Sequence, residues 1–104
     1  MKNFPLKMNN QEKIFQIVKR IPKGKVVTYK QIARISGIKS PRVIGNIIHK
    51  NKYPDSIPCH RVVKSDGTLA TGYAFGGIKA QKKKLIDEGI KFVKNKIDLN
   101  IYQI

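Results

Sequence analysis

Apolar residues recur at helical spacing along the first part of the chain. One predicted helix begins at Asn10 and carries its apolar stripe at Ile14, Ile17, Val18 and Ile21. Intervals of three and four residues place these side chains on one face of a helix. Pro22 ends the helix and opens a turn at residues 22–25, because proline cannot continue the backbone hydrogen bonds of a helix. Val26–Val27 is long enough for only a very short strand.

Start and stop signals predict two further helices. Thr28 with Gln31 three positions later is a capping-box pattern, and Gly37 stands where a glycine closes a helix. Ser40–Pro41 supplies an N-cap and a first-turn proline for the next helix, which reaches about His49. Two short helices joined by a glycine-containing turn indicate a helix-turn-helix. An ordinary helical corner in a small core is the alternative interpretation.

The second half of the chain mixes strand, turn and helix signals. We predict a strand at 61–63, a hairpin turn at 64–67, a return strand from 68, a glycine-rich loop at 70–77 and a helix at 78–88. Gly89 ends this helix, and Ile90 is placed for the hydrophobic contact of a Schellman motif. The weak alternation of the last residues fits a strand, a docked extension or a mobile end.

Together these elements predict a mostly α fold. Its centre is a helix-turn-helix in a winged-helix-like three-helix core, accompanied by a small β-hairpin. A chain of 104 residues supports one modest core. We expect an N-terminal arm at residues 1–9, a single domain at 10–93 and a C-terminal tail at 94–104.

Positive charge dominates the composition. The chain has 22 Lys plus Arg against 6 Asp plus Glu, a formal net charge of +16. This imbalance favours a polyanionic partner, most simply nucleic acid, although much of it also forms a solvated lysine surface. The single cysteine excludes an internal disulfide, no apolar run approaches the ~20 residues of a membrane span, and residues 1–10 lack a signal-peptide core. We expect a cytosolic protein, or a nuclear one in a eukaryote, with no membrane association.

The only cysteine lies in the segment Ile57–Val63. Pro58 stiffens the backbone that leads to Cys59. His60 is a base with a pKa near neutrality, and the charge of Arg61 favours thiolate over thiol. These neighbours indicate a nucleophile. A small buried hydrophobic side chain is the alternative, because residues adjacent in a strand point to opposite faces.

This chain contains six consecutive residues that resemble the active-site signature of the O6-alkylguanine-DNA alkyltransferases: Pro58-Cys59-His60-Arg61-Val62-Val63. Proteins of this family repair alkylated guanine by moving the alkyl group onto their own cysteine. The similarity runs from about residue 10 to residue 93, and residues 24–33 resemble the segment that opens the family's helix-turn-helix. The resemblance implies a catalytic role for Cys59.

Five further positions take roles from this resemblance. Tyr29 falls on a tyrosine that helps rotate the target nucleotide and protonates the guanine ring, and Arg42 on an arginine that replaces the extruded base in the stack. Asn51 falls on an asparagine that braces the active-site turn. Glu88 falls on the glutamate that orients the histidine, and Tyr73 in the loop that covers the alkyl pocket. Four of these positions have an alternative interpretation: a core aromatic for Tyr29, a phosphate contact or surface charge for Arg42, a loop former for Asn51 and a helix-end carboxylate for Glu88.

Attack on a carbon attached to guanine O6 requires the base to leave the helix first, and a side chain that fills the gap offsets part of the cost. The predicted catalytic set is Cys59, His60, Glu88, Asn51 and Tyr29. The predicted DNA contacts are Arg42, Tyr29, Ser40, Gly45, Asn46 and Arg61. The predicted pocket residues are Tyr73, Pro58 and Gly72. No cofactor and no metal are expected.

Two departures from the family pattern matter. Its repair proteins usually carry an N-terminal domain, so we expect the arm, the tail or a separate partner to complete the active-site wall. Short relatives, the alkyltransferase-like proteins, bind alkylated DNA without repairing it and commonly have tryptophan in place of the cysteine. Cys59 is retained here together with His60, Asn51 and Glu88, which favours chemistry.

We therefore predict a monomeric DNA repair protein. It binds duplex DNA in the minor groove, flips out O6-alkylguanine and transfers the alkyl group irreversibly to Cys59. The alternatives are a non-catalytic sensor of alkylated DNA and a sequence-specific helix-turn-helix regulator. A cysteine hydrolase built on Cys59 and His60 is the weakest alternative, because nothing else in the chain resembles an acyl-transfer site.

Overall fold

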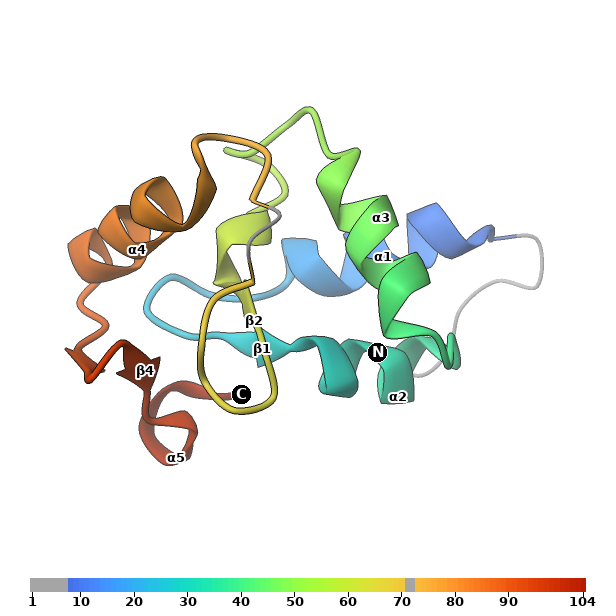
Figure 1. Ribbon diagram of the computed structural model, residues 1–104. Coiled ribbons are helices and arrows are strands. Elements are labelled where there is room, and N and C mark those ends of the chain that lie inside the picture. The colour runs from blue at the N-terminus through green and yellow to red at the C-terminus, as the bar shows by residue number, and fades with distance from the viewer. Residues whose placement is uncertain (1–7, 71–72) are drawn as a thin grey trace.

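The computed structural model describes residues 8–70 and 73–104 (Figure 1). Its elements in chain order are α1 (Asn10–Lys19), β1 (Val27–Thr28), α2 (Tyr29–Ser36), α3 (Pro41–His49), the 3-10 helix η1 (Cys59–Arg61), β2 (Val62–Val63), α4 (Gly77–Asp87), β3 (Phe92–Val93), β4 (Lys96–Ile97) and α5 (Leu99–Tyr102). The mostly α fold class with a helix-turn-helix core is confirmed.

Side-chain caps fix the starts of the first three helices. Thr28 Oγ1 accepts a hydrogen bond from the Gln31 amide at 3.1 Å, and Ser40 Oγ accepts one from Val43 at 3.3 Å. Each satisfies an amide that has no partner inside its helix. Gly37 closes α2 with a φ of 77°, a left-handed conformation that glycine adopts without strain. The predicted starts of α2 and α3 are confirmed.

A two-stranded parallel sheet separates two hydrophobic cores. Val27 pairs with Val62 and Thr28 with Val63. Because neighbouring side chains of a strand point to opposite faces, Val27 and Val62 enter the core of α1–α3 while Val63 and the preceding Val26 enter a second core. Figure 1 shows β1 and β2 in the middle, with α2 and α3 on one side and α4, β4 and α5 on the other. The segment Cys59–Val63 contributes to both cores and so joins the two halves.

The second core contains residues from the end of the chain. Leu85, Ile90 and Ile97 are buried there. The last residues also add to the edge of β1, since the Val26 amide donates to Tyr102 O at 2.9 Å and the Ile104 amide donates to Val26 O at 3.1 Å. Two of the three possibilities for the tail are therefore observed: residues 91–104 contain the strands β3 (Phe92–Val93) and β4 (Lys96–Ile97), and the last residues dock on the chain beside β1.

The predicted hairpin at residues 61–69 is wrong in its position. A turn does form there, closed by a hydrogen bond from the Lys64 amide to Thr68 O at 2.9 Å, but β2 pairs with β1 rather than with a return strand. The hairpin is β3–β4, whose two-residue loop has Lys94 and Asn95 at positive φ. Asparagine tolerates this conformation in tight hairpin loops. None of the helices within 8–70 and 73–104 is long and apolar enough to cross a membrane.

Candidate functional site

The end of α4 delivers a carboxylate to the segment Ile57–Val63, which contains Cys59. Gly89 has a φ of 95°, its amide donates to Ile86 O at 2.9 Å, and the Ile90 amide donates to Leu85 O at 3.1 Å. This pair of bonds is the predicted Schellman motif, and Ile90 and Leu85 pack in the same core. The motif holds Glu88 as the last residue before the chain turns away.

Glu88 is the centre of a polar network. Its Oε2 lies 2.7 Å from His60 Nε2, and its two oxygens accept hydrogen bonds from Arg61 Nε at 2.9 Å and Nη2 at 2.7 Å. The Gly24 amide donates to Oε1 at 3.3 Å. Burial alone would raise the pKa of Glu88, but the hydrogen bonds from Arg61, His60 and Gly24 outweigh it and lower the pKa to about 2. Glu88 is therefore a carboxylate at any physiological pH.

Arg61 belongs to this network and not to the cavity beside Cys59 described below. Its Nη1 also donates to Ile21 O at 2.7 Å, and only 15% of its side chain is exposed. Because Glu88 compensates its charge, Arg61 does not act as the free cation that the sequence suggested beside the thiol. Nothing in this arrangement brings Arg61 toward a DNA surface, so its predicted DNA contact stays a prediction.

Asn51 ties the loop after α3 to the cysteine segment. Its Nδ2 donates to Ile57 O at 2.8 Å, and its Oδ1 accepts from the Tyr53 amide at 2.9 Å. The side chain is 3% exposed. The Cys59 amide then bonds to Ile57 O at 2.7 Å as η1 begins. The bracing contact implied for Asn51 is thus present in the geometry.

Cys59 is 4% exposed and packs with the core of α1–α3. Burial raises the pKa of its thiol, while the Asn51 side chain, the local backbone N–H and the charge of Lys84 act in the opposite direction. The sequence-based expectation of a lowered pKa is therefore wrong for the free protein. Desolvation of the anion decides the direction, and burial could not be read from the sequence.

His60 is held as a neutral base. Burial lowers its pKa, against the raising effect of Glu88. Because a carboxylate only accepts hydrogen bonds, His60 Nε2 carries the hydrogen and donates a hydrogen bond to Glu88. Its Nδ1 is buried and has no hydrogen-bond partner in the described part of the chain. That nitrogen is free to accept a proton.

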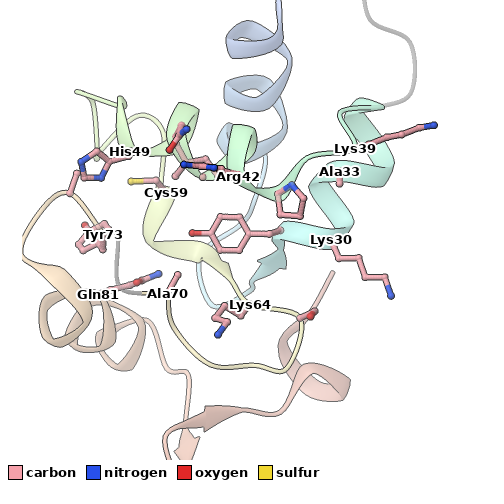
Figure 2. A pocket seen from close by; sticks show the side chains of 17 residues that line it. Lys30, Ala33, Lys39, Arg42, His49, Cys59, Lys64, Ala70, Tyr73 and Gln81 are labelled. Carbon is pink, nitrogen blue, oxygen red and sulfur yellow. The ribbon is translucent and has the colours of Figure 1, made fainter.

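A cavity of about 760 Å³ opens beside Cys59. Figure 2 shows the sulfur pointing into it, with His49 and Tyr73 nearby. Basic side chains line it at Lys30, Lys39, Arg42 and Lys64, and none of its described lining residues is Asp or Glu. A polyanion therefore meets a uniformly attractive surface around the thiol.

One face of α3 lines this cavity. Arg42, Gly45, Asn46 and His49 face it, whereas Ile44 is fully buried on the opposite side. A Cβ added at Gly45 would meet no atom within 4 Å, so glycine here leaves the surface open rather than serving the packing of the protein itself. The predicted DNA contacts Arg42, Gly45 and Asn46 are thus brought together, but Ser40 is used as the N-cap of α3.

Two tyrosines complete the wall. Tyr29 opens α2 and lines the cavity; burial and then the nearby Cys59 raise the pKa of its hydroxyl, so it stays protonated. Tyr73 packs edge-on against Phe75 with ring centroids 5.7 Å apart. Its hydroxyl is buried without a hydrogen-bond partner in the described chain. Pro58 instead lines a separate cavity of about 300 Å³, and the predicted pocket residue Gly72 lies outside the described residues.

Sequence reasoning missed two side chains of α4. Gln81 is 3% exposed, and its Nε2 donates to His60 O at 3.0 Å and Val62 O at 3.1 Å. The ammonium group of Lys84 lies 5.6 Å from the centre of the Tyr73 ring. The run Lys82-Lys83-Lys84 suggests a solvated helix face, but only Lys83 is exposed, whereas Lys82 and Lys84 are partly buried. The spacing of 81, 84 and 88 on one helix face was the available signal.

No group of three or more His, Cys, Asp or Glu side chains suited to a metal ion occurs within residues 8–70 and 73–104. Cys59 lines the larger cavity and His60, the next residue, lines the smaller one. The chemistry available at the site is that of a thiol, a neutral imidazole on the adjacent residue, a protonated phenol and a basic surface. Such a set suits transfer of a carbon group to sulfur from an anionic ligand.

Comparison with known proteins places this geometry in a family. The family described as 6-O-methylguanine DNA methyltransferase, DNA binding domain, matches residues 9–90. The methylated-DNA–protein-cysteine methyltransferase of Methanothermobacter thermautotrophicus is 41% identical over 80 residues, covering 77% of this chain and 44% of that protein. The chain spans about half the length of the curated relatives it matches.

Two solved structures show the same fold. S. pombe Atl1, in complex with damaged DNA containing O6-carboxymethylguanine, has a TM-score of 0.80 and 31% identity, over 90% of this chain and 93% of that one. The O6-methylguanine-DNA methyltransferase of Pyrococcus kodakaraensis strain KOD1 has a TM-score of 0.68 and 34% identity, over 81% of this chain and 48% of that one.

Proposed function

Because the chain belongs to the O6-methylguanine DNA methyltransferase family through its DNA-binding domain, we propose that it repairs alkylated DNA. It binds duplex DNA in the minor groove, takes an O6-alkylated guanine out of the stack and transfers the alkyl group to Cys59. The observation that carries this proposal is the placement of Cys59 in a basic cavity with Tyr29 and Arg42, backed by the His60–Glu88 pair.

The transfer is a displacement at carbon. His60 Nδ1 takes the thiol proton, directly or through a water molecule, while Glu88 stabilises the imidazolium that forms. The sulfur of Cys59 forms a bond to the alkyl carbon as the C–O6 bond breaks. The electron pair of the C–O6 bond stays with the guanine. Tyr29 donates a hydrogen bond to the ring as negative charge develops, and the proton lost by the thiol balances the proton gained by guanine. One protein is consumed for each lesion.

DNA binding supplies the energy for base extrusion. Unstacking one base costs a few kcal/mol. Arg42 is exposed at the start of α3, so its planar group can stack in the gap while its charge meets phosphate. Neutralising about four to six phosphates implies a salt dependence of log K near −4 to −5 per decade.

Counting lesions tests this proposal. The whole chain is mixed with an excess of duplex containing O6-methylguanine, and the modified base that remains in the DNA is quantified. We expect loss of one lesion per protein molecule and then no further reaction. Cys59→Ser should leave every lesion in place while still retaining the duplex. Continued turnover, or repair by Cys59→Ser, would overturn the assignment.

A lesion sensor is the second candidate. Its support is the similarity over 93% of the length of Atl1, together with the burial that raises the pKa of Cys59. A sensor holds the O6-methylguanine duplex more tightly than the unmodified duplex and leaves the lesion count unchanged. The same experiment therefore separates the two functions.

A further inference from the structure

One face of α4 and its C-terminal end contact residues 60–62, directly after Cys59, at successive helical turns. Gln81 bonds to the carbonyls of His60 and Val62, and Glu88 bonds to His60 and Arg61. Lys84 lies between them, three residues after Gln81 and four before Glu88, so all three side chains leave the helix on the same side. α4 therefore presents an amide, a cation and a carboxylate to one short segment.

The position of Lys84 is set by contacts on two sides. Its ammonium group lies over the ring of Tyr73, which lines the Cys59 cavity, and the same side chain lines the smaller cavity with His60 and Glu88. Lys84 is partly buried, unlike Lys83, whose side chain is 78% exposed. Its aliphatic stem fills space while its charge stays near the polar groups.

Lys84 is not neutralised by a partner. In the described part of the chain, the ion pairs are His60–Glu88, Arg61–Glu88 and Lys83–Asp87. Arg61, the cation closest to Cys59 in sequence, is thus compensated, whereas Lys84 keeps its full charge beside the same segment. A positive charge in a partly desolvated place stabilises a nearby anion more than an exposed one does.

We propose that Lys84 supplies the positive charge that stabilises the Cys59 thiolate, acting as a positioning residue through space rather than by touching the alkyl carbon. This inference rests on the proposed function insofar as it takes Cys59 as the nucleophile. It gives α4 a second electrostatic role besides the orientation of His60 by Glu88.

The charges around Cys59 agree with this role. Tyr29 faces it from α2, His49 lines the same cavity from α3, and Asn51 approaches from the loop. His60 and Arg61 follow it in η1, and Glu88 and Lys84 face the segment from the end of α4. Tyr29 stays neutral, and Arg61 and Glu88 compensate one another. The four other basic residues that line the cavity are exposed, so water screens their charges more than that of the partly buried Lys84: Lys30, Lys39, Arg42 and Lys64. Lys84 lowers the pKa of both Cys59 and His60, which favours thiolate beside a neutral imidazole.

The test uses Lys84→Gln, with Lys83→Gln as a matched control on the same helix. Iodoacetamide is the probe, because the thiolate sulfur forms the new C–S bond as iodide leaves, and the chain has one cysteine. We measure the rate of Cys59 modification against pH. Lys84→Gln should shift the midpoint to higher pH and slow the reaction near pH 7 by about three- to tenfold, since one pKa unit is a tenfold change.

Control variants separate charge from packing. Lys83→Gln should match the wild type, and Lys84→Arg should restore the midpoint. Lys84→Met retains an apolar side chain of similar length and should behave as Lys84→Gln, with circular dichroism verifying the fold. Thiolate absorbance against pH, with Cys59→Ser subtracted, gives the same midpoint independently of access to the cavity. An unchanged midpoint in Lys84→Gln and Lys84→Met, or an equal shift in Lys83→Gln, would overturn the proposal.

This experiment does not depend on DNA. A chain that shows the Lys84 effect with iodoacetamide but leaves O6-methylguanine intact contradicts the repair function and not the role of Lys84. A chain that repairs the lesion without any Lys84 effect contradicts only the role of Lys84.

Discussion

The two halves of the molecule differ in how they are built and in what they give to the site. The core of α1–α3 consists of isoleucines and valines at helical spacing, and it holds Cys59. The second core gathers Val26, which precedes β1, with residues from β2, α4 and the end of the chain, and Glu88 directly follows α4. Cys59 thus belongs to one half, and the carboxylate that holds the neighbouring imidazole belongs to the other.

This division makes η1 the critical junction. His60 and Arg61 reach from the segment of the first half to Glu88 in the second. The contacts of His60 and Arg61 with Glu88 therefore depend on docking of α4, whereas α1–α3 have a core of their own. Perturbing one half should therefore affect binding and chemistry differently from perturbing the other.

Removal of a large side chain from the core of α1–α3 should have the largest effect on stability, and the same change in the second core provides the comparison. Ile32→Ala in the first core should lower the free energy of unfolding by about 3–4 kcal/mol, because Ile32 is fully buried among close-packed neighbours. Ile97→Ala in the smaller second core should lower it by about 2 kcal/mol. Urea denaturation followed by circular dichroism measures both, and a larger loss for Ile97→Ala would reverse this ranking of the cores.

Loss of the central carboxylate should come next. Glu88→Gln leaves the Arg61 guanidinium without its anion in a partly buried place and should cost about 2–3 kcal/mol of stability. It should also slow alkyl transfer by about 100-fold, because His60 loses the group that stabilises its protonated form. Asp87→Asn, at an exposed pair one residue away, should change stability by less than about 0.5 kcal/mol. Equal effects of the two variants would contradict the special role of Glu88.

Acid should weaken the junction in a defined window. The pKa of Glu88 is about 2 in the folded chain, below its ordinary value of 4.5, so the unfolded chain binds the proton first. Its contribution, about 2–3 kcal/mol, is present above pH 4.5 and is lost as the pH falls toward 2. The pKa of His60 is also lowered in the folded chain, so its contribution to stability is likewise lost as the pH falls, beginning below pH 6.5. Denaturation across this range should show the loss in the wild type and a smaller loss in Glu88→Gln.

A change on the exposed face of α3 should have the smallest effect on the fold. Arg42→Ala removes an exposed side chain from α3 and should weaken binding to a lesion duplex about tenfold, leaving the unfolding midpoint unchanged. Arg20→Ala removes an exposed arginine that does not line the cavity, and it serves as the control for net charge. Titration of both variants with labelled duplex compares their affinities. An equal loss of affinity in Arg20→Ala would mean that Arg42 contributes only its positive charge.

The same division explains what could be predicted from sequence. Helical spacing, the Thr28 and Ser40 caps and the Schellman glycine are local signals, so α2, α3 and the end of α4 follow from them. The parallel pairing of Val27 with Val62 joins positions far apart in the chain, and no local pattern contains it. The strand signal at Val62–Val63 was therefore assigned to the wrong partner.

The site divides in the same way. The resemblance supplied Cys59, His60 and Glu88, and the structure brings His60 and Glu88 together. Arg61 was misread because its charge is visible in the sequence, whereas its bidentate contact with Glu88 depends on docking of α4. The raised pKa of Cys59 and the position of Lys84 likewise depend on burial and packing between the halves.

The most direct measurement is the mass of the intact protein, with peptide mapping, after incubation with duplex containing O6-methylguanine. Cys59→Ser and an unmodified duplex are the controls. The account predicts that the wild-type chain gains one methyl group in place of the thiol hydrogen, located on Cys59, and that neither control gains any mass. An unchanged mass in a wild-type sample that retains the lesion duplex would contradict alkyl transfer and identify the chain as a sensor.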